Sequence, residues 1–138
     1  MSSHLIKLGV VMDPIEAIKP AKDTTLAMLL AAQARGWELH YMEQMDLYLR
    51  DGEARARLRQ LAVRDAVQNW HQFGTEQDAA LSSLDVVLMR KDPPFDMEYV
   101  YTTYILERAA AGGTLVINRP AALRDANEKA YTDRKSVV

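Results

Sequence analysis

The sequence contains no cysteine, only three histidines and no long apolar run. Without cysteine there is no disulfide framework, no thiolate metal ligand and no thiol nucleophile. His4, His40 and His71 lack the spacing of a zinc or iron site. The longest apolar stretch, residues 26–32, is far shorter than the roughly 20 residues that span a membrane. Signal-peptide features are also lacking at the N-terminus, so the expected compartment is the cytoplasm.

An excess of charge of one sign is lacking as well. The 17 basic and 19 acidic residues give a net charge of −2. This balance argues against a generally basic nucleic-acid binder and against a highly charged disordered chain. With 138 residues, of which 49% are hydrophobic, the chain has the size and composition of one soluble domain with a sizeable core.

Apolar runs alternate with helical patterns along the chain. The four core strands are expected at residues 5–12, 37–42, 84–89 and 114–118. Helices are expected at residues 24–35, 96–111 and 120–131. The first helix is apolar on nearly all sides, so we expect it to be well buried. The alternation predicts a three-layer, Rossmann-like α/β domain with a mostly parallel central sheet.

An antiparallel insertion is predicted after the second strand. Residues 46–50 and 53–63 flank Asp51-Gly52, a strong signal for a two-residue turn, so we predict an inserted β-hairpin. The polar stretch that follows, residues 65–83, is expected to be an irregular connection.

Three arginines in the hairpin recur with period two. Arg55, Arg57 and Arg59 would therefore share one face of a strand. The pattern has two interpretations, a surface for an anionic ligand or partner and an ordinary solvated face. The solvated face is the commoner arrangement for arginine.

Several catalytic and nucleotide-binding motifs are absent. The sequence has no phosphate-binding GxxxxGK[ST] loop, no GxGxxG turn after the first strand and no GxSxG elbow. A phospho-receiver domain would need an acidic pair after the first strand and an acceptor aspartate at the end of the third. Only Asp13 follows the first strand, and Asp85 begins the third, which argues against that class.

Ligands of parallel α/β sheets bind at the carboxyl ends of the strands. Arg90 and Lys91 follow the third strand and could pair with a carboxylate or phosphate, while two prolines stiffen their loop, residues 90–96. Alternatively, Asp92 pairs with one of these cations and the prolines only shape the start of a helix. Asp13 could position a cationic ligand group or accept hydrogen bonds in an Asp-Pro turn.

The predicted last helix also carries charged side chains. Arg124 and Glu128 are four residues apart and can pair on its surface, with Asn127 and Lys129 beside them. Spacing alone favours this surface role.

Several segments resemble the N-terminal domain of bacterial glutathione synthetase. The most specific is the twelve-residue stretch Asp85-Val86-Val87-Leu88-Met89-Arg90-Lys91-Asp92-Pro93-Pro94-Phe95-Asp96. The resemblance continues in residues 8–14, 38–43, 46–48, 104–107, 116–120 and 123–129. It covers nearly the whole chain, from about residue 5 to residue 131.

The resemblance implies a function. Members of this family join γ-glutamylcysteine to glycine with ATP and Mg²⁺. ATP phosphorylates the cysteinyl carboxylate, and the glycine amine attacks the acyl phosphate. By resemblance, Asp13, Arg90, Lys91 and Asp92 would bind substrate and Lys129 would contact an ATP phosphate. No catalytic residue, metal ligand or cofactor is assigned to this chain, and the family members are homo-oligomers.

The resemblance also implies a domain organisation. Residues 1–119 would form the pre-ATP-grasp domain, residues 120–132 would begin the link to the ATP-grasp part, and residues 133–138 resemble no family segment. We therefore expect a chain truncated before the ATP-grasp part and inactive alone. The alternative is a binding or oligomerisation module that acts through its sheet edge, hairpin or arginine face. No nucleic-acid or membrane partner is expected.

Overall fold

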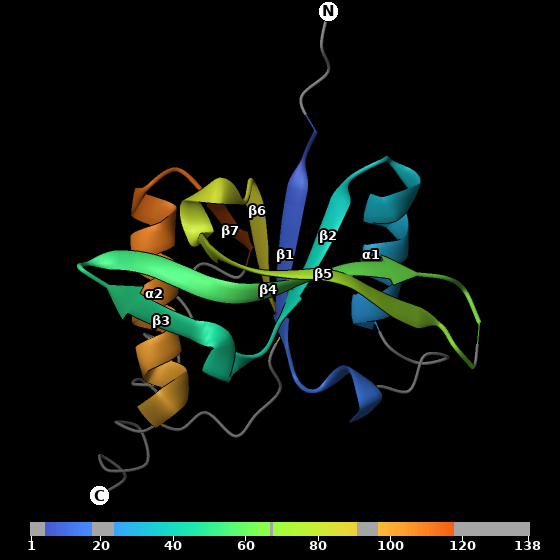
Figure 1. Cartoon of the computed structure of the whole chain (residues 1–138), viewed down its shortest axis with the longest axis horizontal. Coiled ribbons are helices and arrows are strands. Elements are labelled where there is room, and N and C mark those ends of the chain that lie inside the picture. The colour runs from blue at the N-terminus through green and yellow to red at the C-terminus, as the bar shows by residue number, and fades with distance from the viewer. Residues whose placement is uncertain (1–4, 18–23, 67, 91–96, 118–138) are drawn as a thin grey trace, which may run out of the picture.

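A curled sheet separates two helices in the computed structural model, which describes residues 5–17, 24–66, 68–90 and 97–117 (Figure 1). Helix α1 covers one face of the sheet and α2 the other, which confirms the three-layer α/β architecture. The elements in chain order are β1 (Lys7–Met12), η1 (Ile15–Ala17), α1 (Thr24–Ala34), β2 (Glu38–Met42), η3 (Gln44–Asp46), β3 (Leu47–Arg50), β4 (Glu53–Val63), β5 (His71–Ala80), η4 (Leu81–Ser83), β6 (Val86–Arg90), α2 (Met97–Ala111) and β7 (Leu115–Ile117).

The sheet combines a parallel centre with an antiparallel flank. Its strand order is β3-β4-β2-β1-β6-β7, with β5 paired to β4. The β1 strand pairs in parallel with β2 and β6, and β6 pairs in parallel with β7. The four core strands predicted from the sequence therefore form the parallel part. The helix predicted at residues 120–131 lies outside the described residues.

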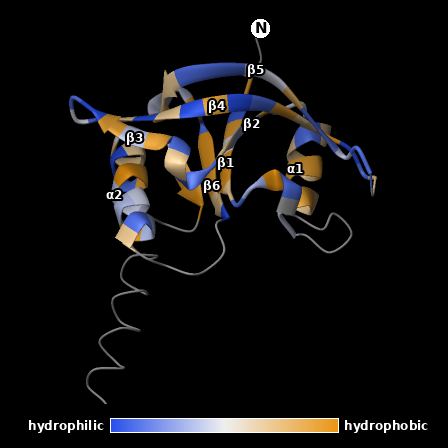
Figure 2. Cartoon of the chain, turned by 60° about the horizontal axis from the view of Figure 1, so that its bottom comes forward, coloured by the Kyte–Doolittle hydropathy of each residue, from blue (hydrophilic) through white to orange (hydrophobic). Residues whose placement is uncertain are grey.

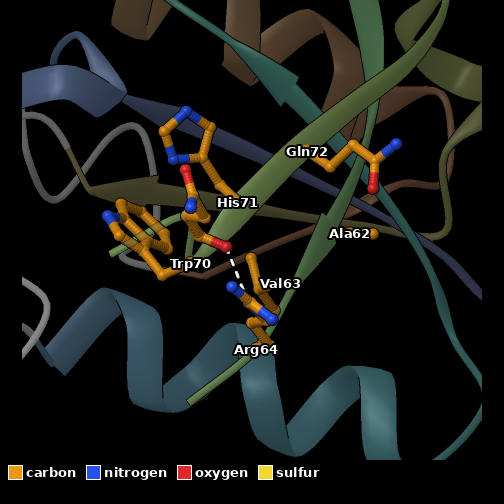
Figure 3. A pocket seen from close by; sticks show the side chains of 7 residues that line it. Ala62, Val63, Arg64, Trp70, His71 and Gln72 are labelled. Atoms are coloured by element: carbon orange, nitrogen blue, oxygen red, sulfur yellow. Dashed lines mark hydrogen bonds between the residues drawn. The ribbon is translucent and has the colours of Figure 1, made fainter. Parts of the chain in front are cut away.

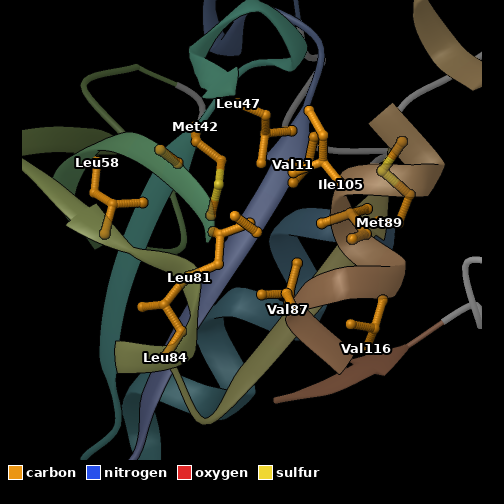
Figure 4. Packing of buried hydrophobic residues seen from close by; sticks show 14 of the residues in the cluster. Val11, Met42, Leu47, Leu58, Leu81, Leu84, Val87, Met89, Ile105 and Val116 are labelled. Carbon is orange, nitrogen blue, oxygen red and sulfur yellow. The ribbon is translucent and has the colours of Figure 1, made fainter. Parts of the chain in front are cut away.

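Strand β1 is buried on both faces. Val10 and Met12 belong to the apolar cluster on the α1 side, whereas Val11 belongs to the cluster on the α2 side (Figure 4). Alternate side chains of a strand point to opposite faces, so this central strand needs apolar residues throughout. Central and outer strands differ in hydropathy: apolar residues lie along β1 and β6, and hydrophilic residues lie along β5 (Figure 2).

Helix α1 is less buried than predicted. Its buried residues are Thr25, Leu26, Leu29 and Ala32, whereas Ala27 and Ala31 are exposed. The sheet packs against one side of the helix only. Alanine favours helix formation on an exposed face as readily as on a buried one, so a sequence of Leu and Ala does not reveal which side faces solvent.

The inserted hairpin of β3 and β4 is confirmed. Asp51 and Gly52 connect the two strands with φ values of 52° and 79°. Positive φ at both central residues is the requirement of a type I′ turn, which matches the twist of the strands it joins. Strand β4 continues beyond β3 and pairs with β2 in antiparallel orientation, so the hairpin extends the parallel sheet.

The expectation of an irregular connection over residues 65–83 is wrong. Residues His71–Ala80 form β5, which pairs with β4 from Arg55↔Ala80 to Val63↔His71. Most of β5 is exposed, and the strand has no run of buried apolar residues. Backbone pairing with β4 therefore defines this strand, and the alternating pattern that would predict it is missing.

Gly9 occupies a tight position in β1. A Cβ atom at this residue would lie 2.6 Å from Leu84 Cδ1 and 2.6 Å from Met42 Cε. We expect Gly9→Ala to lower the free energy of unfolding by about 1–3 kcal/mol, because the added methyl group overpacks the core. Urea denaturation measures this change.

Gly74→Ala in β5 is the matched control. The nearest atom to a Cβ there is Gln60 Cβ at 3.4 Å, an ordinary contact. This variant should stay within about 0.5 kcal/mol of the wild type. Equal stability of the wild type and Gly9→Ala would contradict the packing argument.

Candidate functional site

Charged side chains lie where the parallel strands end. Asp13 follows β1, Glu43 follows β2, and Arg90 is the last residue of β6. The register pairs Met12 with Arg90, so the ends of β1 and β6 lie side by side. This edge of the sheet is where ligands of parallel α/β domains bind.

Arg90 is held by the first turn of α1. Its Nε donates a hydrogen bond to Thr25 Oγ1 at 3.2 Å, with Thr25 buried and Arg90 half-buried. The contact fixes the guanidinium near the end of β1. Local sequence patterns did not point to Thr25, because its partner lies 65 residues away along the chain.

Of the other predicted site residues, only Asp13 lies within the described part of the chain. Asp13 is half-buried at the end of β1 and interacts with other groups of the chain. Lys91, Asp92 and Lys129 lie outside the described residues, so the structure brings together Asp13 and Arg90 alone of the predicted set. The roles of all five side chains remain predictions.

Tyr41 connects the ends of β1 and β2. Its hydroxyl accepts a hydrogen bond from the Ile15 backbone N–H at 3.1 Å and donates one to Glu43 Oε2 at 2.5 Å. The pKa of the Tyr41 phenol is raised above its ordinary value. Burial is the largest cause, and the hydrogen bond to Glu43 is the second. Periodicity predicted Tyr41 in a strand but not this link, which depends on a residue 26 positions away.

The three arginines of β4 have different surroundings. Arg55 forms ion pairs with Glu53 Oε1 at 2.7 Å and with Asp78 Oδ1 at 3.1 Å. The pKa of Arg55 is raised by its hydrogen bonds, of which the one to Glu53 has the largest effect. The pKa of Asp78 is lowered, mainly because the Tyr48 hydroxyl donates a hydrogen bond to its carboxylate. Arg57 is exposed. For these two arginines the structure favours the solvated-face interpretation.

A separate pocket lies at the joined ends of β4 and β5 (Figure 3). Arg64 is one of its lining residues, and the Arg64 Nε donates a hydrogen bond to the Asn69 carbonyl oxygen at 2.7 Å. No predicted site residue lines this pocket. Its lining residues are Ala62, Val63, Arg64, Asn69, Trp70, His71 and Gln72.

Within residues 5–17, 24–66, 68–90 and 97–117, three or more His, Asp or Glu side chains nowhere gather as a metal site would require. In the same ranges, neither helix is long and apolar enough to cross a membrane.

The fold and the charged edge define the class of the chain, a Rossmann-like α/β domain with a candidate ligand site at the carboxyl ends of its parallel strands. A family model described as the N-terminal domain of prokaryotic glutathione synthetase matches residues 6–124. The chain therefore belongs to this family, as the sequence resemblance implied.

Individual relatives agree with the family model. Proteins named glutathione synthetase from Photorhabdus laumondii, Yersinia pestis and Salmonella typhimurium are 65%, 63% and 62% identical over 128 residues. Each alignment covers 93% of this chain. The chain spans only about 40% of the length of these relatives, so it corresponds to their N-terminal domain.

The raised pKa of Tyr41 makes stability pH-dependent on the alkaline side. An unfolded tyrosine ionises near pH 10. The stabilisation from the neutral, buried phenol is therefore complete below about pH 10 and is lost as the pH rises further. We expect Tyr41→Phe to flatten this decline by up to about 1.4 kcal/mol per pH unit.

Urea denaturation between about pH 8 and pH 11 tests this expectation. Burial also raises the pKa of Tyr99, which remains in both proteins, so the comparison isolates Tyr41. Glu43→Gln should make the decline end at a lower pH and reduce its total size, because a negative charge no longer opposes the phenolate and the folded-state pKa of Tyr41 moves toward the unfolded value. Parallel curves for the wild type and Tyr41→Phe would contradict the assignment.

Proposed function

We propose that this chain is the substrate-binding N-terminal part of an ATP-dependent ligase that joins γ-glutamylcysteine and glycine to give glutathione. Membership of the glutathione synthetase N-terminal family supports this function. The structural observation that carries it is Arg90, which the hydrogen bond to Thr25 orients beside the end of β1. A guanidinium at this edge can bind a substrate carboxylate through two parallel hydrogen bonds.

The charges of the dipeptide match the proposed residues. γ-Glutamylcysteine has two carboxylates and one ammonium group, so it requires both cations and anions in its site. Arg90 and Lys91 would bind carboxylate, and Asp13 and Asp92 would bind the ammonium group. Arg90 is paired with Met12, the residue before Asp13, so both side chains would face one small ligand at this edge.

The remaining chemistry belongs to the whole protein. There, ATP with Mg²⁺ would phosphorylate the cysteinyl carboxylate, and the glycine amine would displace phosphate from the acyl phosphate. Lys129 would hold an ATP phosphate as a point charge. We assign no catalytic group to this chain and propose that it forms no glutathione alone. Residues 1–119 would form the domain, residues 120–132 the link onward and residues 133–138 a tail outside the family pattern.

We also propose a cytoplasmic homo-oligomer as the working form. A second candidate function, a binding or oligomerisation module without catalysis, is favoured by one observation on α2. Met97, Tyr101 and Tyr104 are exposed by 80%, 52% and 47%, and their spacing places them on one helix face. An apolar stripe of this kind is typical of an interaction surface. Light scattering that shows a monomer at high concentration would count against assembly.

The role of Arg90 can be tested on this chain by titration calorimetry with γ-glutamylcysteine. We expect saturable binding that Arg90→Ala weakens by about tenfold or more, because a charge-assisted hydrogen bond is lost. Arg50→Ala is the control, since Arg50 is exposed at the turn of the β3–β4 hairpin. Equal weakening by both variants, or a change in thermal stability alone, would contradict a binding role for Arg90.

The role of Lys129 requires the whole protein. We expect Lys129→Ala to raise the ATP concentration needed for half-maximal rate, because a phosphate contact is removed. The steady-state dependence of rate on ATP measures this effect. Unchanged ATP kinetics would remove Lys129 from the nucleotide site.

A further inference from the structure

The guanidinium of Arg59, the third arginine of β4, lies over two aromatic rings. Its Cζ atom lies 4.6 Å from the centroid of the Phe73 ring and 5.5 Å from that of Tyr41. The two rings also contact each other, with centroids 5.1 Å apart. Cation–π contacts with both rings therefore restrain the position of the guanidinium.

The hydrogen-bond donors of Arg59 have no protein partner in the part of the chain that the structure describes. Glu76 lies directly opposite Arg59 in the β4–β5 register, yet no ion pair joins them. Arg55, on the same strand face, instead binds Glu53 and Asp78. No Arg59 nitrogen is among the buried atoms without a partner, so these donors are accessible to solvent.

The pairing of β4 with β2 and the contact with Tyr41 together fix the position of Arg59. Arg59 is paired with Tyr41 in the β4–β2 register. The Tyr41 hydroxyl is in turn held by Ile15 and Glu43, at the ends of β1 and β2. Arg59 is therefore a preorganised cation, and preorganisation lowers the entropy lost when a ligand binds.

We propose that Arg59 binds an oxyanion, a carboxylate or phosphate group, through the edge of its guanidinium. Both rings lie beside the Cζ atom, and no acceptor among the described residues binds the guanidinium N–H groups, so these can form two parallel hydrogen bonds with an oxyanion. This site involves β2, β4 and β5 and includes none of the residues assigned to the ligase. It is therefore independent of the proposed function.

Neighbouring charges set the strength of the site. Glu76 opposite Arg59, and Glu43 and Glu16 near Tyr41, oppose an incoming anion, whereas Arg57 favours it. We therefore expect binding in the millimolar range. Glu76→Gln should strengthen it severalfold, because it removes the opposing charge from the directly facing position.

The experiment is an NMR titration of the 138-residue chain with inorganic phosphate and, separately, with glutarate at constant ionic strength. The observed signals are the Arg59 Nε–Hε resonance and the ring resonances of Tyr41 and Phe73. We expect a saturable shift of all three. Arg59→Lys keeps the positive charge but loses the paired N–H groups of the guanidinium. This variant should bind the anion about tenfold more weakly or worse.

Arg57→Met is the matched control. Arg57 lies two residues away on the same face, is exposed and contacts neither ring, so this variant should keep the affinity within about twofold. A saturable response to glutarate alone would identify a carboxylate site, and a response to phosphate alone would identify a phosphate site. A response to both supports a general oxyanion site.

Two results would overturn the proposal. One is the lack of a saturable shift with either anion. The other is equal weakening by Arg57→Met and Arg59→Lys, which would show nonspecific attraction to the charge of the β4 face. Because Arg59→Lys retains the aliphatic stem and the charge, a loss of binding in this variant does not depend on a loss of fold.

Discussion

Burial of β1 on both faces is the constraint from which the rest of the structure follows. The strand lies between β2 and β6 and has one apolar cluster on each side. Two faces need two covering layers, which α1 and α2 supply. Parallel pairing on both sides then aligns the ends of β1, β2 and β6 at a single edge. The position of Asp13 beside Arg90 is thus a consequence of how the core is packed.

Long-range contacts complete this edge. Thr25 comes from α1, on one face of the sheet, and meets Arg90 from β6. The Tyr41 hydroxyl joins the segment after β1 to the end of β2. Each contact uses one buried side chain on the α1 side of the sheet, Thr25 of α1 or Tyr41 of β2. Any change in how α1 or β2 packs would therefore displace the candidate ligand groups, which connects the stability of the core to the geometry of the site.

Patterns within short segments predicted most of this fold. The apolar strands, the Asp51-Gly52 turn and the helices expected at residues 24–35 and 96–111 follow from local sequence, and the structure has each of them. Strand β5 was missed because its side chains are mostly exposed and only its backbone pairing makes it a strand. The Thr25–Arg90 bond was missed for a related reason, since 65 residues separate its partners and nothing local couples them.

The three arginines that recur with period two in β4 could not be distinguished from the sequence, whereas their contacts in the structure distinguish them. Spacing correctly placed Arg55, Arg57 and Arg59 on one strand, but it left the same two interpretations open for all three. Strand β5 supplies Asp78 to Arg55 and Phe73 to Arg59, so a strand with no predictive pattern of its own distinguishes them. A carboxylate neutralises one guanidinium, whereas aromatic rings orient the other and leave its charge available. The strand that the sequence did not reveal therefore determines which arginine can bind an anion.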